Sequence, residues 1–334
     1  MNKKLIASLF ILSVALFMGC KDSTKIGYSI GEISSERMSQ ESFILENEID
    51  SLGATPLMEY AYRGTNEQLQ QANNLIDDGV SVLVVFPTDS NDWNSLVSKA
   101  HDKNVKVIAY ENLLQYADVD YFFSFDNQEV GRQQAEYAVA HRPKGNYILI
   151  EGPDYDYNSM LYLYGQMNVL QPYIDRGDIN VLYERNLDNW DALDAYIEMQ
   201  TFLEKNKNVK IDAIIAANDQ LASGCIKALD HMLGDWDILI TGQDATVTGL
   251  QNILDGKQSM TVYKSFKDLA TITADEAVIN IAKGGDPEGV NNSINNGLKD
   301  VPSVLLKTTV VDTTNIRQTV IADGFVREDQ LTFP

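Results

Sequence analysis

Short apolar runs recur along the chain and alternate with longer segments in which apolar residues return every three or four positions. The clearest runs cover residues 25–30, 80–86, 105–110 and 211–216. Continuous runs of Val, Ile and Leu separated by amphipathic helices are typical of a parallel sheet covered on both faces. The pattern therefore predicts an α/β protein.

The alternation of strands and helices runs through the chain in two series. The first series ends with the strand at 105–110, and the second restarts with a strand at 121–125 and continues with strands at 147–150, 179–184 and 211–216. Segments 81–89 and 212–219 resemble each other, since both end an apolar strand with polar residues at the start of a helix. A chain of 334 residues also exceeds what one core usually fills. We therefore expect two doubly wound parallel-sheet lobes.

The amino-terminal segment has the features of an export signal. Lys3 and Lys4 precede an apolar run at 5–18, which is shorter than the roughly 20 residues that a spanning helix needs. The junction Gly19-Cys20 resembles a bacterial lipobox. We predict a lipoprotein signal peptide at 1–19, lipidation of Cys20, a tether at 20–24 and a location in the cell envelope. An ordinary cleaved signal with an incidental cysteine is the alternative.

Charge and cysteine content exclude two classes of protein. The chain has 26 Lys and Arg residues against 48 Asp and Glu residues, a formal net charge of −22. Such a charge repels phosphate backbones, so we expect no nucleic-acid partner. Cys225 has no second cysteine to pair with once Cys20 is lipidated, which leaves no disulfide framework.

Polar side chains follow the predicted strands at their carboxyl ends, where ligands bind in open parallel sheets. They are Glu36, Arg37, Thr88, Asp89, Glu111, Asn112, Asp154, Asp156, Asn158, Asp188, Asn189, Trp190, Asn218, Asp219, Gln243, Asp244 and Lys264. Carboxylates and amides pair with sugar hydroxyls, and an aromatic ring covers the apolar face of a sugar. Each residue taken singly also suits a helix cap or a turn, Asp156 and Asn218 especially.

Catalysis is disfavoured. Glu111 and Asp244 could form a glycosidase pair, but nothing in the sequence raises the pKa of either residue. The three histidines lie far apart along the chain, and no zinc-ligand spacing occurs. Residues 154–165 begin like a calcium loop but have Ser159 at the sixth position and Gly165 at the twelfth. We expect no enzyme activity, no cofactor and no metal.

Several longer stretches resemble the bacterial xylose-binding proteins, a family of periplasmic sugar-binding proteins. They are Ser124-Phe-Asp-Asn-Gln-Glu-Val-Gly131, Gly165-Gln-Met167, Thr241-Gly-Gln-Asp-Ala245, Met260-Thr-Val-Tyr-Lys264, Asn295-Asn-Gly-Leu-Lys-Asp-Val-Pro-Ser303 and Asp323-Gly-Phe325. The resemblance extends from residue 25 to about residue 330.

The resemblance implies the type I periplasmic binding protein fold, in which three crossing strands join two lobes that close over a sugar. We expect the first lobe at 25–126 plus about 264–300 and the second at 127–263 plus about 301–330. The ligand-binding positions of the family then correspond to Arg37, Glu111, Asp156, Asn158, Trp190, Asn218, Asp244 and Lys264, with Asn112 at a further such position.

At three positions the chain departs from the family. Met38 replaces a tryptophan, and Asn112 and Leu163 replace arginines. Because each lost guanidinium removes several donors, we expect weaker xylose binding and a preference for another neutral monosaccharide or a larger substituted sugar. The resemblance also implies a monomer that passes the sugar to an ABC permease. Presentation of the sugar to a membrane histidine kinase or chemoreceptor is the alternative.

Overall fold

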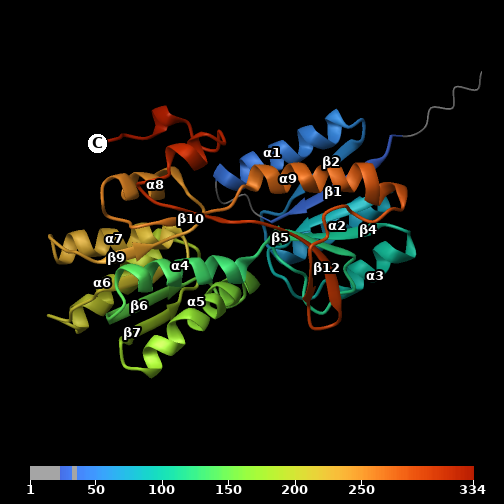
Figure 1. Cartoon of the computed structure of the whole chain (residues 1–334). Helices are drawn as coiled ribbons and strands as arrows, with labels where there is room; N and C mark the ends of the chain where they lie inside the picture. The colour runs from blue at the N-terminus through green and yellow to red at the C-terminus, as the bar shows by residue number, and fades with distance from the viewer. Residues whose placement is uncertain (1–22, 32–35) are drawn as a thin grey trace, which may run out of the picture.

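The computed structural model describes residues 23–31 and 36–334, and it contains two separate, mainly parallel sheets. The predicted lipidation site Cys20 and the signal peptide lie outside the described residues. Figure 1 shows that each sheet, with the helices around it, forms a lobe. We call the lobe built on strands β1–β5 the first lobe and the lobe built on β6–β9 the second. The expected α/β fold with two parallel-sheet lobes is confirmed.

The first sheet has the strand order β11-β12-β5-β4-β3-β1-β2. Its strands are β1 (Lys25–Ile30), β2 (Thr55–Tyr60), β3 (Val82–Phe86), β4 (Lys106–Tyr110), β5 (Tyr121–Phe125), β11 (Asn292–Asn295) and β12 (Asp300–Leu306). The helices of this lobe are α1 (Glu36–Ser51), α2 (Thr65–Asp77), α3 (Asn94–Asp102) and α9 (Phe266–Asp275).

The second sheet has the order β7-β6-β8-β9. Its strands are β6 (Gly145–Glu151), β7 (Ile179–Asn186), β8 (Ala213–Ala216) and β9 (Leu239–Thr241). Beside it, β10 (Thr261–Tyr263) and β13 (Thr309–Val311) form an antiparallel pair. The helices are α4 (Asn127–His141), α5 (Tyr157–Asp175), α6 (Ala192–Lys205), α7 (Asp219–Met232) and α8 (Val247–Leu254).

Each sheet separates two apolar cores, as the continuous apolar runs predict. In β3, Val82 and Val84 pack toward α1 and α9, whereas Leu83 and Val85 pack toward α2 and α3. The alternation follows from strand geometry, because successive side chains point to opposite faces. No helix among the described residues is both long enough and apolar enough to cross a membrane.

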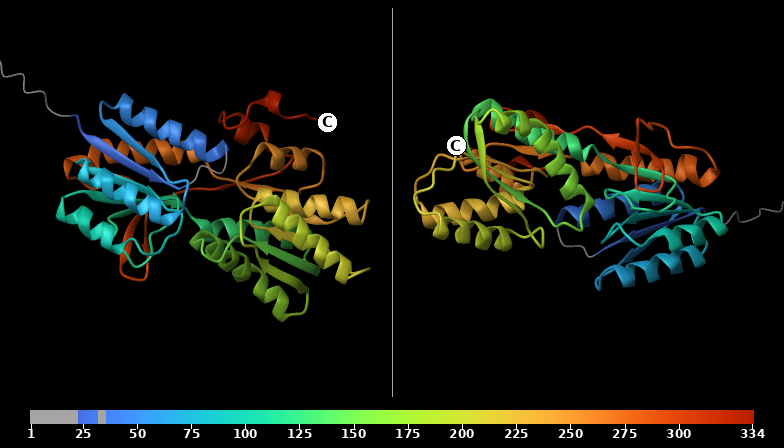
Figure 2. Two further views of the ribbon diagram at one scale, coloured as in Figure 1. Left: turned by 180° about the vertical axis from the view of Figure 1, so that it is seen from behind. Right: turned by 90° about the horizontal axis from the view of Figure 1, so that it is seen from below.

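The chain passes between the lobes at three places, which Figure 2 shows from two further sides. They lie between β5 and α4, between β10 and α9, and between β12 and β13. The expected boundary at residue 300 was wrong for residues 301–306, because β12 pairs in parallel with β5 of the first sheet. The ladder with β5 and the hairpin with β11 keep the whole strand in the first lobe. The chain therefore crosses after Leu306, and the segment from β13 onward packs against the second lobe.

Helices α4 and α5 approach each other closely through two glycines. A Cβ atom at Gly131 would lie 1.9 Å from the carbonyl oxygen of Tyr162, and one at Gly165 would lie 2.0 Å from that of Gln128. A side chain at either glycine would force the two helices apart. This contact places the amino-terminal turns of both helices beside the crossing between the lobes.

Candidate functional site

The carboxyl ends of β1 and β4 bring a cation and an anion together in the first lobe. Arg37 lies in the first turn of α1, and Glu111 directly follows β4 with a left-handed φ of 61°. Arg37 Nη2 donates to Glu111 Oε1 at 2.9 Å. Glu111 is only 3% exposed, so the ion pair lies at the base of the site.

The second lobe and the crossing that follows it contribute a second anion and a second cation. Asp244 follows β9 and Lys264 follows β10, at the second crossing. Arg37 Nη1 donates to Asp244 Oδ1 at 3.2 Å, and Lys264 Nζ donates to Glu111 Oε1 at 2.9 Å. Lys264 Nζ also lies 3.8 Å from Asp244 Oδ1. These four side chains, which we call the charge cluster, join the two lobes.

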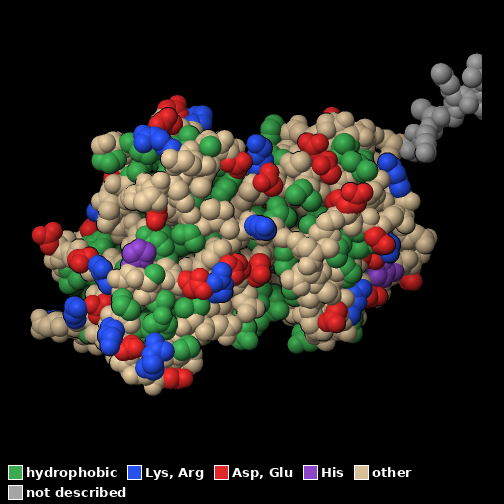
Figure 3. All heavy atoms as spheres, in the orientation of Figure 1, with side chains coloured by type: hydrophobic (Ala, Val, Ile, Leu, Met, Phe, Trp, Pro, Cys, Tyr) green, Lys and Arg blue, Asp and Glu red, His purple; other side chains and the backbone are tan. Residues whose placement is uncertain are grey.

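Mutual pairing keeps Glu111 and Lys264 ionised in spite of their burial. Burial opposes ionisation of Glu111, but Lys264 and Arg37 outweigh it and lower the Glu111 pKa to about 2. Burial likewise acts to lower the pKa of Lys264, but Glu111, Tyr162 and Asp244 together outweigh it, so the Lys264 pKa is raised. Two cations against two carboxylates leave the charge cluster without net charge. Elsewhere, acidic and basic side chains are interspersed over the surface that Figure 3 shows.

An aromatic wall stands beside the charge cluster in the second lobe. Trp190 Nε1 donates to Asp156 Oδ2 at 2.9 Å, and the Trp190 and Tyr162 rings meet edge to face with centroids 6.3 Å apart. Behind the indole, a Cβ atom at Gly152 would lie 2.1 Å from the Trp190 ring. The indole is therefore fixed in position. Its partner Asp156 is buried, and burial raises the pKa of Asp156.

Three of the expected residues serve the backbone as well as the site. Asp156 and Asn218 accept from the backbone N–H groups of Asn158 and Leu221, so both cap helices, α5 and α7 respectively. The Asn158 amide donates to the backbone oxygen of Glu111 at 3.2 Å across the lobes. For Asp156 and Asn218 the capping role is thus present, and Asp156 in addition accepts from the Trp190 indole.

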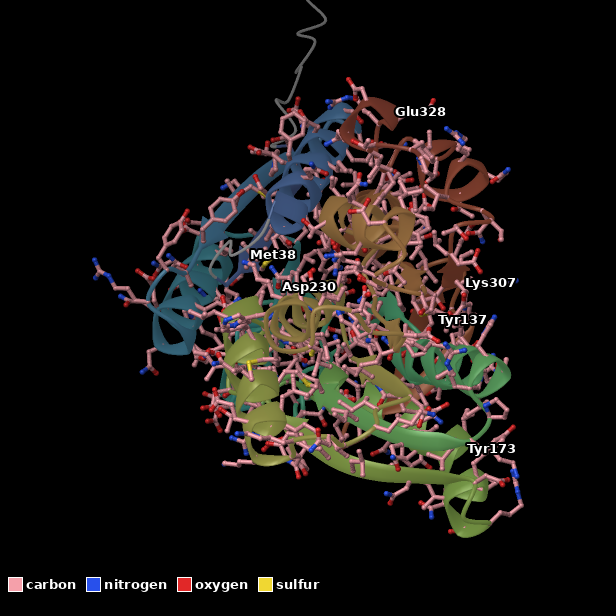
Figure 4. All side chains as sticks on the ribbon, turned by 90° about the vertical axis from the view of Figure 1, so that its left-hand side faces the viewer. Met38, Tyr137, Tyr173, Asp230, Lys307 and Glu328 are labelled. Atoms are coloured by element: carbon pink, nitrogen blue, oxygen red, sulfur yellow. The ribbon has the colours of Figure 1, made fainter. Side chains whose placement is uncertain are left out.

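One of the three departures from the family lies differently from what the sequence suggested. Leu163 was expected in the sugar-facing wall, and this was wrong, because it packs into the apolar core on the far side of α5. The preceding residue, Tyr162, lies at the site instead and accepts from Lys264 Nζ at 3.4 Å. One residue along a helix is a rotation of about 100°, which changes the face. Met38 packs partly against the core of the first lobe, and Figure 4 shows it on α1.

Sequence reasoning missed Tyr162, although a signal was available. Tyr162 lies four residues after Asn158, and residues at this spacing share one face of a helix. A search for polar groups at strand ends does not reach a position in the second turn of α5.

Several buried polar atoms at the site have no hydrogen-bond partner among the described residues. Three are acceptors, namely Glu111 Oε2, Asn112 Oδ1 and Asn127 Oδ1, and one is the donor Arg37 Nε. Unpaired buried acceptors are costly unless a ligand or water donates to them. The site therefore suits a ligand rich in hydroxyl donors.

Neither catalysis nor metal binding gains support from the arrangement. A glycosidase acid needs a raised pKa, whereas that of Glu111 is lowered. No group of three or more His, Cys, Asp or Glu side chains within the described ranges is arranged to hold a metal. A pocket of about 600 Å³ lies at the opposite edge of the first sheet, beside Gly79 and Lys106. It is therefore separate from the charge cluster, which lies at the carboxyl ends of the strands.

Comparison with known proteins gives a consistent set of relatives. A family model described as a periplasmic binding protein domain matches residues 45–286. The chain is 39% identical to the D-xylose-binding periplasmic protein of Escherichia coli (strain K12), over 98% of this chain and 97% of the relative. It is 30% identical to the multiple sugar-binding periplasmic receptor ChvE of Rhizobium radiobacter, over 96% of each chain. An ABC transporter solute-binding protein from Clostridium phytofermentans, solved with β-D-glucose, superimposes with a TM-score of 0.85 at 29% identity, covering 92% of this chain and 100% of that one.

Proposed function

Because the chain belongs to the periplasmic binding protein family, in the sugar-binding group that includes the D-xylose-binding proteins, we propose that it captures a neutral monosaccharide between its lobes. It then delivers the sugar to an ABC-type importer. The names of the relatives support a binding role, and none of those compared above is named as an enzyme.

The observation that carries the proposal is the charge cluster. Arg37 and Glu111 come from the first lobe and Asp244 from the second, so a ligand that pairs with all three favours closure of the lobes. Both cations of the charge cluster already face carboxylates, so an anionic ligand would add a buried negative charge without a partner, at a cost of several kcal/mol. A neutral polyhydroxyl ligand avoids that cost.

The identity of the sugar depends on Asn112. An arginine here would offer a rigid fork of donors, whereas Asn112 offers one amide whose oxygen is buried and unpartnered among the described residues. We therefore propose xylose or a related neutral sugar, with weaker xylose binding than in arginine-bearing relatives. Leu163 no longer supports this preference, because it faces away from the site.

A thermal-shift screen of pentoses, hexoses, polyols and sugar acids tests the proposed function. A neutral sugar at about 100 times its Kd is expected to stabilise the folded protein by about 2.7 kcal/mol, and sugar acids are expected to leave the melting temperature unchanged. Calorimetry then gives the Kd of each sugar that raises it. A screen in which only sugar acids, or no sugars, stabilise the protein would contradict the proposal.

Replacing Trp190 by alanine is expected to cost about 1–3 kcal/mol of sugar-binding free energy, because the sugar loses an apolar ring face that is held in place. Calorimetry on the folded variant measures the loss. Trp236→Ala is the matched control, since Trp236 packs partly against the same core but bonds to Asp230, away from the charge cluster. Equal affinity in the two variants would place Trp190 outside the ligand contacts.

We also propose that the protein is exported and held in the cell envelope by lipid on Cys20. The support is sequence alone: a positive start, a short apolar run and Gly19-Cys20. Mass spectrometry of the mature protein should find acylated Cys20 at its amino terminus, and an unmodified terminus elsewhere would contradict this.

Sensing is the second candidate role. One relative at 30% identity is named a receptor, which favours presentation of the sugar to a membrane sensor. Neighbouring genes distinguish the two roles, since an importer requires a permease and an ATPase.

A further inference from the structure

A third carboxylate lies behind the charge cluster. Glu41 is one turn after Arg37 on α1 and is fully buried. Tyr110 donates its hydroxyl to Glu41 Oε1, and Glu41 Oε2 lies 3.7 Å from Arg37 Nε. Neither Glu41 Oε2 nor Arg37 Nε has a hydrogen-bond partner among the described residues.

This geometry leaves one edge of the Arg37 guanidinium for Glu41. The two terminal nitrogens point at Glu111 and Asp244, so the Nε edge is the part that turns back toward α1. A guanidinium offers donors in a rigid, planar fork, and fixing one edge fixes the direction of the others. Glu41 therefore stands where it can orient the arginine without touching the sugar.

The charged and titratable groups around Glu41 determine its protonation state. Glu41 is faced by Tyr28 from β1, by Tyr110 and Glu111 at the end of β4, by Arg37 from α1 and by Lys264 from the second crossing. With Glu41 protonated, two cations meet two carboxylates. With Glu41 ionised, Arg37 and Lys264 face three carboxylates, and the Nε edge of Arg37 gains a charged partner. Burial raises the Glu41 pKa to about 7, Arg37 acting to lower it and Glu111 to raise it.

We propose that Glu41 is a positioning residue for sugar binding: in its ionised form it holds the Nε edge of Arg37, so that the terminal nitrogens face Glu111, Asp244 and the ligand. When Glu41 is protonated, the guanidinium loses this anchor, and the contact between the lobes weakens. The inference rests on the proposed function and adds pH control to the same site.

The first test is the pH profile of sugar affinity. A sugar found by the screen is expected to bind at least about 5-fold more tightly at pH 8 than at pH 6 in the unaltered protein. E41Q, which resembles the protonated acid, should bind with the weaker affinity at both pH values. E41D should retain the pH dependence with lower affinity, because its carboxylate is withdrawn by one methylene. E46Q is the matched control, since it removes the same charge from an exposed position of α1.

A second measurement does not need a sugar. Because an oriented Arg37 bridges to Asp244 of the second lobe, the ligand-free protein should have a smaller radius of gyration at pH 8 than at pH 6. Small-angle scattering should show this difference in the unaltered protein and in E46Q, and not in E41Q. The difference requires the Arg37 bridge, so a merely structural role for Glu41 would not produce it.

The outcomes separate this inference from the proposed function. If no sugar binds at any pH, the proposed function fails, and the scattering comparison still decides the role of Glu41. If a sugar binds but its affinity is flat between pH 6 and 8, rises toward pH 6, or changes equally in E41Q and the unaltered protein, the inference about Glu41 is overturned while the proposed function stands.

Discussion

Replacing Lys264 by methionine is expected to lower the free energy of unfolding by about 3 kcal/mol and to abolish sugar binding. Lys264 is only 2% exposed and donates to Glu111, which is itself buried. Methionine fills a similar volume but leaves the Glu111 carboxylate with Arg37 as its remaining cation. The loss of one partner of a buried ion pair costs far more than the loss of an exposed one. Urea denaturation at neutral pH measures the change.

Two comparisons make this result specific. Lys257→Met removes a lysine whose ion pair with Asp230 is exposed to solvent, so it should cost less than about 1 kcal/mol. Adding Glu111→Gln to Lys264→Met removes the stranded charge and should recover part of the stability. If Lys264→Met is no more destabilising than Lys257→Met, then Lys264 does not compensate a buried charge.

Replacing Glu151 by glutamine is expected to stabilise the protein at alkaline pH by about 2–4 kcal/mol and to have little effect near pH 5. Glu151 is fully buried at the end of β6. Gln166 donates to Glu151 Oε2 at 3.4 Å, and Oε1 has no partner among the described residues. Burial, offset in part by Gln166, raises the Glu151 pKa from 4.5 to about 8.

The direction of the effect follows from the proton that the folded state keeps. Between about pH 4.5 and pH 8 the folded protein holds this proton and the unfolded chain has lost it. The contribution of Glu151 to stability is therefore full below pH 4.5 and is lost as the pH rises through 8. Glutamine is neutral throughout, so the variant avoids this loss.

Urea denaturation at about pH 5, 7 and 9 checks the prediction. Glu41 and Asp219, whose pKa values burial raises to about 7, add their own pH dependence, so the informative quantity is the difference between variant and unaltered protein. Glu204→Gln serves as the control, because Glu204 is an exposed carboxylate on α6 that does not act on Glu151. A difference that stays constant from pH 5 to pH 9 would contradict a protonated Glu151.

The search for polar residues at the carboxyl ends of strands located all four members of the charge cluster, because it depends on local information. Arg37, Glu111, Asp244 and Lys264 all follow strands that the apolar pattern identifies, and carboxyl ends of parallel strands meet at one edge of a sheet. Which of them pair was not predictable. Arg37 and Asp244 are 207 positions apart and meet only because the two lobes face each other in a particular way.

The path of the chain between the lobes likewise could not be predicted from the sequence. Segment 301–306 has an apolar pattern that fits either sheet, and only its ladder with β5 assigns it to the first. Figure 4 shows Lys307, the next residue, at the side where the chain crosses to the second lobe. Backbone pairing between distant strands decides which sheet segment 301–306 joins, and the periodicity of its side chains does not predict that pairing.

The sequence by itself determined the elements, the two-lobed α/β class and the edge at which the polar residues gather, because repeats of about 2 and 3.6 residues record which faces are buried. Only the tertiary structure decided that Tyr162 rather than Leu163 lies at the site, that β12 belongs to the first sheet and that Glu41 is buried behind Arg37. A shift of one residue turns a helical side chain by about 100°, and a buried carboxylate differs from an exposed one only in its neighbours. Both depend on packing between segments that are distant in the chain.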